Sequence, residues 1–385
     1  MKSTTKLMIL FISIFAILFA IPMVSNAAET ETATDESTLR TAIENVNDGG
    51  TVEIQNNITV TGPIVIQKEL TIDGNGYTIA GSTEWTSTSG NQTMFTAQFA
   101  AGKLTLKDID LNNGPKYGVQ AYDGATVILD NVSITGFRYG GVLVNGGNVE
   151  VRDLHLGTNG TGANNGIEID KGAAATNNPT LTMNGTLTSD STENVVKPAD
   201  NGYLTDFTIT NTENTTNKVV IAGDKVVLTD ENNNVISESA IPEDATPNTT
   251  EKAKVIVTLV KGDETKQIII DEGTKVTADL LKSHITVEEG YEIEGFYTDE
   301  GYTKAFDFDT ALNANITIYA RIAEIAQEEP TPTPEEKPEE KPTTEPEQND
   351  NNKDDVPKTG VESYIGIAAL AIMVSVGAVY FARKK

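Results

Sequence analysis

The 385-residue sequence contains no cysteine and only two histidines, His155 and His284. The lack of cysteine excludes disulfide bonds, thiol catalysis, zinc–thiolate sites and lipid attachment through cysteine. Two histidines argue against a metal centre built from several of them. Basic residues are also scarce, because 28 Lys and Arg stand against 56 Asp and Glu, for a formal net charge of -28. Because such an acidic surface repels phosphate backbones, we expect no nucleic-acid partner.

The first 27 residues have the pattern of a secretory signal peptide. Two lysines precede an apolar run over residues 7–21, and Ser25-Asn26-Ala27 supplies small residues for cleavage. The pattern predicts export, with cleavage between Ala27 and Ala28. An uncleaved transmembrane anchor is the alternative, and the shortness of the apolar run disfavours it.

The C-terminal end consists of four consecutive parts. Residues 324–355 are rich in proline and acidic residues, which predicts a disordered, extended spacer. A five-residue motif follows, made of Val356, Pro357, Lys358, Thr359 and Gly360. Residues 364–381 are apolar and long enough for a transmembrane helix, and the basic residues 383–385 would hold the end of the chain in the cytoplasm.

This order of parts resembles the cell-wall sorting signal of Gram-positive surface proteins, whose usual motif is LPxTG. The first position here is Val356, which departs from that pattern. The resemblance implies that a sortase cuts between Thr359 and Gly360 and joins Thr359 to an amine of peptidoglycan. The membrane would then hold the chain only as a sorting intermediate. A plain tail-anchored membrane protein is the alternative.

The large N-terminal region is a repeat. Residues 104–111, 127–134 and 149–156 align without gaps, and weaker copies occur at 70–72 and 181–183. A second element recurs in step at residues 118–121, 141–144 and 166–169. Each repeat contains short strands of period two, separated by Gly, Asn and Asp turns. A unit of about 22 residues that stacks on itself predicts a parallel β-helix.

Stacking of the repeats predicts which side chains lie above one another. Four aliphatic ladders should fill the interior: Leu104/Val127/Val149, Leu106/Leu129/Val151, Ile109/Val132/Leu154 and Leu111/Ile134/Leu156. On the outside, the ladder Lys107/Asp130/Arg152 alternates in charge, which favours this register over a slipped one.

The start of the repeat region should carry a cap, because an open coil exposes apolar residues at its end. Residues 37–48 place Leu39, Ala42, Ile43 and Val46 on one helical stripe, and Gly49-Gly50 ends the helix. The helix, the glycines and the strands that follow resemble the entry to a pectate-lyase-like right-handed β-helix, over about residues 34–212. The resemblance implies an all-β solenoid but not an activity, since that fold hosts lyases, hydrolases, phage spikes and adhesins.

Catalytic motifs of the lyase and galacturonase relatives are absent from the sequence, so we expect no enzymatic activity and no cofactor. Asp108, Asp110 and Asp153, with His155 above the Asp110 column, form the best acidic group, and a Ca²⁺ site is conceivable there. The favoured alternative is that these are exposed turn acids that form a ladder with Asn131.

Aromatic residues make a better case for sugar binding. The candidates for glycan contact are Trp85, Tyr117, Phe137, Arg138 and Tyr139. Flat apolar rings beside hydrogen-bonding groups are what sugars stack on. The alternative is that these rings pack against the coil.

Residues 253–323 resemble the internalin-type B repeat, a β-grasp-like module of cell-surface proteins. The usual Trp of that family is Phe296 here. The resemblance implies a stalk or a weak interaction domain without catalytic residues. We expect its aromatic residues to form the core: Tyr291, Phe296, Tyr297, Phe306, Phe308 and Tyr319. His284 is expected to be an ordinary strand or loop residue.

The predicted domain order is a signal peptide (1–27), a capped β-helix (28–222), a linker or terminal hairpin (223–252), the B repeat (253–323), the spacer (324–355) and the sorting signal (356–385). Together they predict a sortase-anchored cell-wall protein that displays an adhesin or glycan-binding head. A polysaccharide lyase or hydrolase, and a structural stalk without a ligand, are the alternatives.

Overall fold

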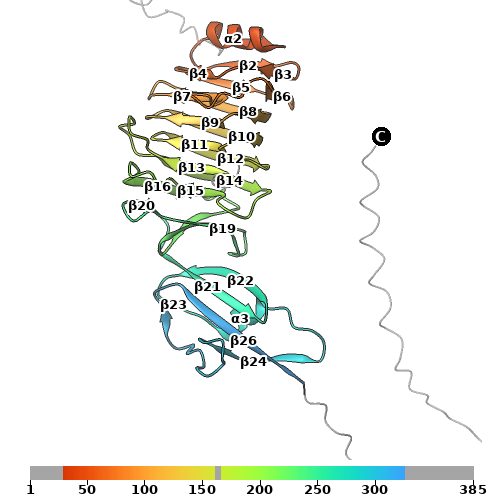
Figure 1. The fold of residues 1–385 in the computed structure, drawn as a ribbon, viewed down its shortest axis with the longest axis vertical. Coiled ribbons are helices and arrows are strands. Elements are labelled where there is room, and N and C mark those ends of the chain that lie inside the picture. Colours follow the sequence, from red (N-terminus) through yellow and green to blue (C-terminus); the bar gives the residue numbers. More distant parts are fainter. Residues whose placement is uncertain (1–28, 161–165, 326–385) are drawn as a thin grey trace, which may run out of the picture. The chain divides into compact units, whose positions relative to one another are not determined.

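The computed structural model describes residues 29–160 and 166–325 of the chain. These residues are almost entirely β-structure (Figure 1), and most of the strands are parallel. The arrangement is compatible with the β-helix that the repeats predict. We call the stacked parallel strands between residues 30 and 249 the coil, and residues 254–325 the module.

Two parallel sheets make up the coil. The first contains β1 (Thr30–Ala33), β2 (Gly50–Ile54), β3 (Ile58–Val60), β5 (Glu69–Asp73), β6 (Thr78–Gly81), β8 (Lys103–Gly114), β10 (Thr126–Phe137), β12 (Asn148–Leu156), β14 (Thr180–Ser189), β16 (Asp206–Asn211) and β20 (Thr246–Thr249). The second contains β4 (Ile64–Ile66), β7 (Phe95–Gln98), β9 (Tyr117–Tyr122), β11 (Gly140–Asn145), β13 (Ile167–Asp170) and β15 (Val196–Pro198). In both sheets, neighbouring strands come from successive repeats.

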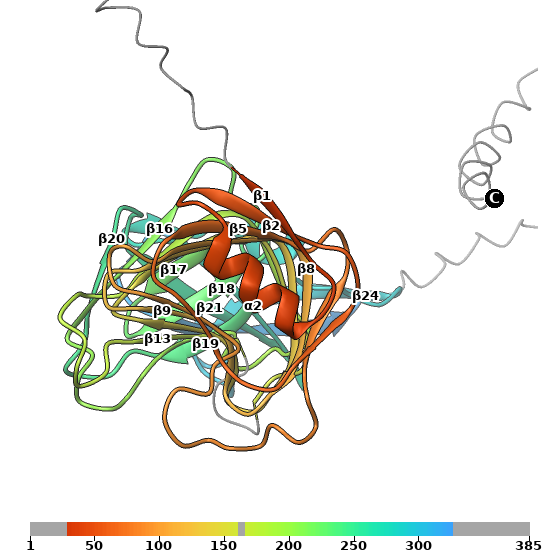
Figure 2. The ribbon, with the colours of Figure 1, turned by 90° about the horizontal axis from the view of Figure 1, so that it is seen from above.

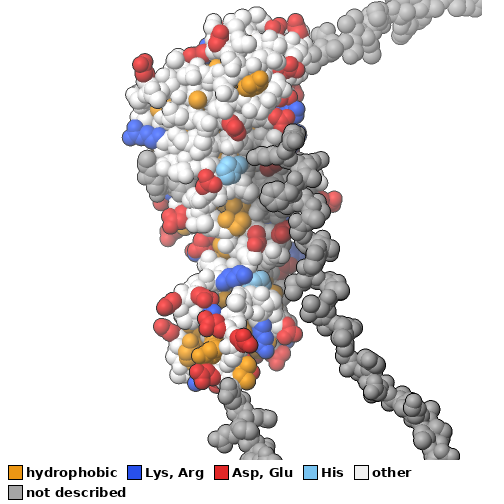
Figure 3. Space-filling view, turned by 90° about the vertical axis from the view of Figure 1, so that its right-hand side faces the viewer, with side chains coloured by type: hydrophobic (Ala, Val, Ile, Leu, Met, Phe, Trp, Pro, Cys, Tyr) orange, Lys and Arg blue, Asp and Glu red, His pale blue; other side chains and the backbone are white. Residues whose placement is uncertain are grey.

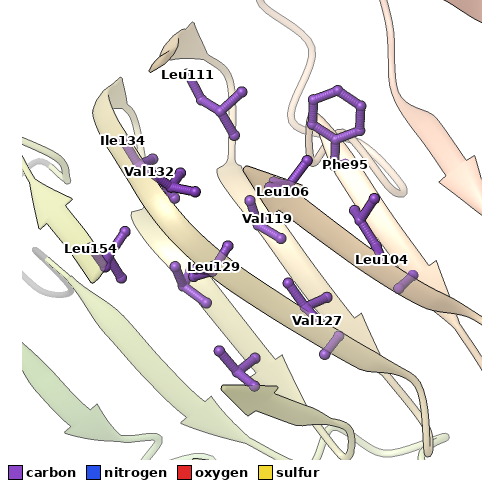
Figure 4. Packing of buried hydrophobic residues seen from close by; sticks show 14 of the residues in the cluster. Phe95, Leu104, Leu106, Leu111, Val119, Val127, Leu129, Val132, Ile134 and Leu154 are labelled. Carbon is purple, nitrogen blue, oxygen red and sulfur yellow. The ribbon is translucent and has the colours of Figure 1, made fainter. Parts of the chain in front are cut away.

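The strand register confirms the four predicted interior ladders. Val127 lies between Leu104 and Val149, and Leu129 lies between Leu106 and Val151. The ladders through Val132 and Ile134 are aligned in the same way, and all twelve side chains are buried. Figure 4 shows several of these aliphatic side chains close together, with Val119 and Phe95 of the second sheet nearby. The coil is therefore held together chiefly by apolar burial that repeats from one turn to the next.

Left-handed residues bend the long strands midway. Asp108 in β8 and Asn131 in β10 have φ angles of 48° and 57°, a conformation that Asn and Asp tolerate better than other side chains. The bend changes the side-chain alternation, so apolar residues face inward on both sides of it. This explains why the predicted ladders occupy the first, third, sixth and eighth positions of each eight-residue repeat.

Helix α2 (Glu36–Asn45) covers the first turn of the coil, as predicted (Figure 2). The side chain of Asp35 caps the helix by accepting a hydrogen bond from the Thr38 amide at 2.8 Å. The predicted stripe of Leu39, Ala42 and Ile43 is buried against the coil. The helix thereby protects the apolar end of the coil from water.

The segment after the repeats differs from the predicted linker. Strands β17 (Val219–Ala222), β18 (Lys225–Thr229) and β19 (Val235–Ala240) form an antiparallel meander. The chain then returns to the coil, where β20 pairs in parallel with β16. Of the two alternatives for residues 223–252, the antiparallel β18–β19 pair agrees with the terminal hairpin, and β20 adds one more strand to the first sheet.

Both faces of the meander are apolar. Val219, Val226 and Leu228 belong to the core of the coil. Val220, Ala222 and Val227 face the other way and pack with Ile256 and Ile269 of the module. A backbone pair between Ala222 and Lys254 continues the meander into the sheet of the module. The meander therefore both closes the last turn of the coil and contacts the module.

The module is a mixed sheet with one short helix. It contains β21 (Lys254–Lys261), β22 (Glu264–Asp271), β23 (Thr274–Lys275), α3 (Ala278–Ser283), β24 (Tyr291–Tyr297), β25 (Ala311–Leu312) and β26 (Ile316–Glu324). Strands β21 and β22 form an antiparallel hairpin around Gly262-Asp263. Phe296 and Phe306 lie in the core as expected, and Phe308 packs edge-on against both. Tyr291 does not, because 40% of it is exposed.

Candidate functional site

The acidic group predicted on the coil includes Asp108, which is engaged in local contacts. The Asp108 carboxylate accepts a hydrogen bond from Asn131 at 2.7 Å and pairs with Lys107 at 3.2 Å. These two contacts, the Asn131 amide first, lower the pKa of Asp108. Over the described parts of the chain, no three His, Asp or Glu residues gather as metal ligands. Asp108, Asp110 and Asp153 therefore do not gather as a set of Ca²⁺ ligands in the described residues, and the contact between Asp108 and Asn131 agrees with the alternative of a ladder of turn residues.

His155 lies in the predicted column on the outer face of the first sheet. Ser133 separates it from Asp110, and Thr188 lies on its other side. The Nδ1 atom of His155 is 3.0 Å from the Thr188 hydroxyl, and its Nε2 atom is 3.7 Å from Asp190. The His155 imidazole is thus a surface group that contacts Thr188 and Asp190. His284 is elsewhere, at the end of α3, where burial and the charge of Lys266 lower its pKa.

Trp85 is not a surface residue. It is 8% exposed and belongs to the core of the coil, and its indole nitrogen donates a hydrogen bond to Gln92 at 2.6 Å. Trp85 thus anchors its loop to the core of the coil. This agrees with the alternative that the ring packs against the coil.

Phe137 and Tyr117 are buried as well. The ring of Phe137 lies against Gly114, where an added Cβ would come within 2.6 Å of it. Glycine is therefore needed on the neighbouring turn to make room for this ring. The hydroxyl of Tyr117 donates a hydrogen bond to the carboxylate of Glu168. Three of the five aromatic-region candidates (Trp85, Tyr117 and Phe137) are thus corrected to packing residues.

Tyr139 and Arg138 remain on the surface. Tyr139 is 37% exposed, and its ring meets the edge of the Tyr117 ring with centroids 6.0 Å apart. The Lys116 ammonium lies 5.9 Å from the centre of the Tyr139 ring and is held by the Gly90 carbonyl at 2.7 Å. We call Tyr139, Arg138 and Lys116 the Tyr139 surface. It presents an exposed aromatic ring that packs against Tyr117, with the Lys116 ammonium near the ring and the exposed Arg138 next to it in the sequence.

Elsewhere the outer face of the coil is covered with polar and paired charged groups. Asp130 is register-paired with Lys107 and forms an ion pair with Arg152 at 3.4 Å, as the predicted outer ladder requires. Lys107 also pairs with Asp73 at 2.8 Å, and this contact, followed by Asp108, raises the pKa of the Lys107 ammonium. Acidic side chains are spread over the face in Figure 3, with fewer basic ones. The Tyr139 surface differs from this background because its two charges are both positive.

Comparison with known protein families finds two matches. Residues 30–148 match a family described as a pectate lyase-like adhesive domain. Residues 348–385 match the LPXTG cell wall anchor motif. A comparison with curated proteins finds no match.

The chain therefore carries a pectate lyase-like adhesive domain and a cell-wall anchor, and it is a surface protein anchored to the cell wall. The anchor implies processing by a sortase and covalent attachment to peptidoglycan. The motif Val356–Gly360, the apolar stretch 364–381 and the predicted signal-cleavage residues Ala27 and Ala28 all lie outside the described residues. Within residues 29–160 and 166–325, no helix has the length and apolar character needed to cross a membrane.

Proposed function

We propose that this cell-wall protein is an adhesin whose coil binds glycan through the Tyr139 surface. The match of residues 30–148 to an adhesive domain supports this proposal, because Tyr139 lies inside the matched range. The observation that carries it is the exposed Tyr139 ring, which packs against Tyr117, lies near the Lys116 ammonium and follows the exposed Arg138 in the sequence. A sugar ring stacks on such a face, and the two cations favour glycans with carboxylate or sulfate groups.

A glycan array tests this binding. We expect the purified chain to bind acidic glycans and the Tyr139→Ala variant to lose most of the signal. Tyr77→Ala is the matched control, because Tyr77 and Tyr139 are both 37% exposed. Equal loss of signal in both variants, or retention in Tyr139→Ala, would reject the Tyr139 surface as the binding site.

The proposal includes a non-catalytic role for the coil. The carboxylates of Asp108 and Asp130 are engaged in ion pairs, which supports a structural use of these acids. Release of reducing or unsaturated sugar from polyuronides or mucin glycans by the purified chain would replace this proposal with the enzymatic alternative. A chain with neither activity nor glycan signal would instead be a structural stalk.

We further propose a right-handed coil, a β-grasp-like B-repeat module that serves as a stalk, and a proline- and acid-rich spacer that spans the wall. Attachment would occur at Thr359 after cleavage before Gly360. Thr359→Ala should leave the protein in the membrane fraction, and Thr359→Ser is the conservative control. Unchanged wall attachment of Thr359→Ala would reject the cleavage position.

A further inference from the structure

The module contains a cleft that the sequence analysis did not anticipate. Its volume is about 440 Å³, within the range of roughly 300–1,000 Å³ that small-molecule sites occupy. Residues from four separate segments line it: Lys261 at the end of β21, Glu288 before β24, Tyr302 in the loop after β24, and Arg321 in β26. Tyr291 forms the remaining aromatic wall. The cleft is therefore a product of the tertiary structure.

Tyr302 is held in the cleft in an unfavourable backbone conformation. Its φ angle is +53°, which is rare for an aromatic residue and is destabilising relative to Gly or Asn. The Asp299 carboxylate fixes the turn by accepting the amides of Thr303 and Lys304 at 3.1 and 2.7 Å. The fold thus maintains a strained turn, and its effect is to place a tyrosine ring at the cleft.

The rings are also fixed from the side. The Tyr302 ring packs against the edge of Tyr297 with centroids 5.4 Å apart, and the Arg321 guanidinium lies 6.0 Å from its centre. Tyr291 also lines the cleft, and its hydroxyl donates to Glu324 at 3.3 Å while 40% of the residue remains exposed. Two oriented aromatic walls with little side-chain freedom left to lose are suited to binding a flat ligand.

The charges of the cleft argue against an anionic ligand. Arg321 forms an ion pair with Glu294 at 2.9 Å, and Lys261 forms one with Glu264 at 2.9 Å. Lys261 also donates to the Thr286 carbonyl at 2.7 Å. Both cations are therefore neutralised by acids of the module, and Glu288 adds a further negative charge. An uncharged ligand rich in hydroxyl groups suits this cleft best. Its hydroxyl groups can replace their hydrogen bonds to water, because Glu288 accepts and Arg321 donates hydrogen bonds.

We propose that this cleft is a second binding site, for an uncharged oligosaccharide of pyranose rings. One sugar face stacks on Tyr291, and the hydroxyl groups meet Arg321 and Glu288. The site is independent of the Tyr139 surface, whose two basic residues favour acidic glycans. The module then binds sugar itself, in addition to any role as a stalk.

The test is calorimetric titration of the purified full-length chain with cellotetraose, chitotetraose and maltotetraose. We expect at least one of them to bind, and we expect Tyr291→Ala to raise its Kd by at least about tenfold. Tyr302→Asn should have a similar effect, since Asn tolerates the left-handed backbone and keeps the turn while it removes the ring. Tyr203→Ala is the control, because Tyr203 is 51% exposed and lies in the coil.

Two further measurements separate the alternatives. Tyr139→Ala should leave this affinity unchanged, so that failure of the glycan proposal for the coil and failure of this one are distinguishable. Far-ultraviolet circular dichroism of Tyr302→Asn and Tyr291→Ala should match the parent chain. The proposal is overturned if no tetrasaccharide binds, if binding persists in both tyrosine variants, or if tetralysine binds at the cleft in place of the sugars.

Discussion

The coil and the module form their cores in different ways. The coil stacks the same aliphatic positions from turn to turn, so that Leu129 meets Leu106 on one side and Val151 on the other. The module has no repeat, and its core includes a cluster of edge-on aromatic rings at Phe296, Phe306 and Phe308. In the coil, a residue is buried because of its place in the period. In the module, a residue is buried because segments distant in the sequence pack against it.

The meander β17–β19 connects these two kinds of core, and disrupting it should have the largest effect. Val227 is fully buried on the face that contacts the module. Val227→Asp should lower the free energy of unfolding by at least about 3 kcal/mol, because it leaves an unpaired charge in an apolar cluster. We expect calorimetry to show separate transitions for the coil and the module.

Asn232→Asp is the matched control for that experiment. It adds the same charge to the same meander, but at an exposed position. A single transition in the Val227→Asp variant, or equal destabilisation by both changes, would contradict the idea that the coil and module cores are joined through this face.

A cavity in the ladders of the coil should have the next largest effect. Leu129 is fully buried in the middle of the coil. Leu129→Ala should cost about 2–5 kcal/mol through lost burial and the cavity left behind. Urea unfolding followed by circular dichroism measures this cost. Ile128→Ala is the control, because Ile128 immediately precedes Leu129 in β10 and is less buried. A similar cost for both variants would argue against the ladder model.

Overpacking at Gly114 should have a smaller effect. An added Cβ would come within 2.6 Å of the Phe137 ring, so Gly114→Ala should cost about 1–3 kcal/mol. At Gly62 the nearest atom to an added Cβ is on the Arg40 side chain at 3.9 Å, so Gly62→Ala should be close to neutral. Thermal unfolding of the two variants distinguishes crowding from a general effect of losing glycine.

The smallest predicted effect concerns pH. Asp123 accepts hydrogen bonds from the amide and hydroxyl of Thr176 and from the amide and side chain of Asn177, at 2.8–3.1 Å. These contacts, the Thr176 amide first, lower the pKa of Asp123 in the folded chain. Its contribution to stability is therefore present above the ordinary pKa of about 3.9 and is lost as the pH falls through the lower folded value.

Asp123→Asn removes that titration. The variant should be slightly less stable near neutral pH and should lose less stability on acidification than the parent. Urea unfolding at several pH values between about 6 and 3 measures the difference. Asn177→Ala should change the profile in the same direction, and parallel profiles for Asp123→Asn and the parent would show that this contact does not contribute.

The aromatic residues show where prediction from the sequence ended. Periodicity places Leu104 or Val132 correctly, but Trp85, Tyr117 and Phe137 lie at bends and in an insertion, where no period applies. Phe137 is buried because the adjacent turn has a glycine opposite its ring. Tyr291 was expected in the core of the module, yet it is one wall of the cleft.

The sequence by itself determined the anchoring signal, the register of the coil and its helical cap, and it predicts an export signal. It could do so because a period of about 22 residues aligns equivalent positions and a one-residue slip would turn apolar side chains to water. Only the tertiary structure decided that β20 rejoins the coil, that the meander joins two cores, and that Tyr291 and Tyr302 line one cleft. These features depend on contacts between segments far apart in the chain, which no local pattern records.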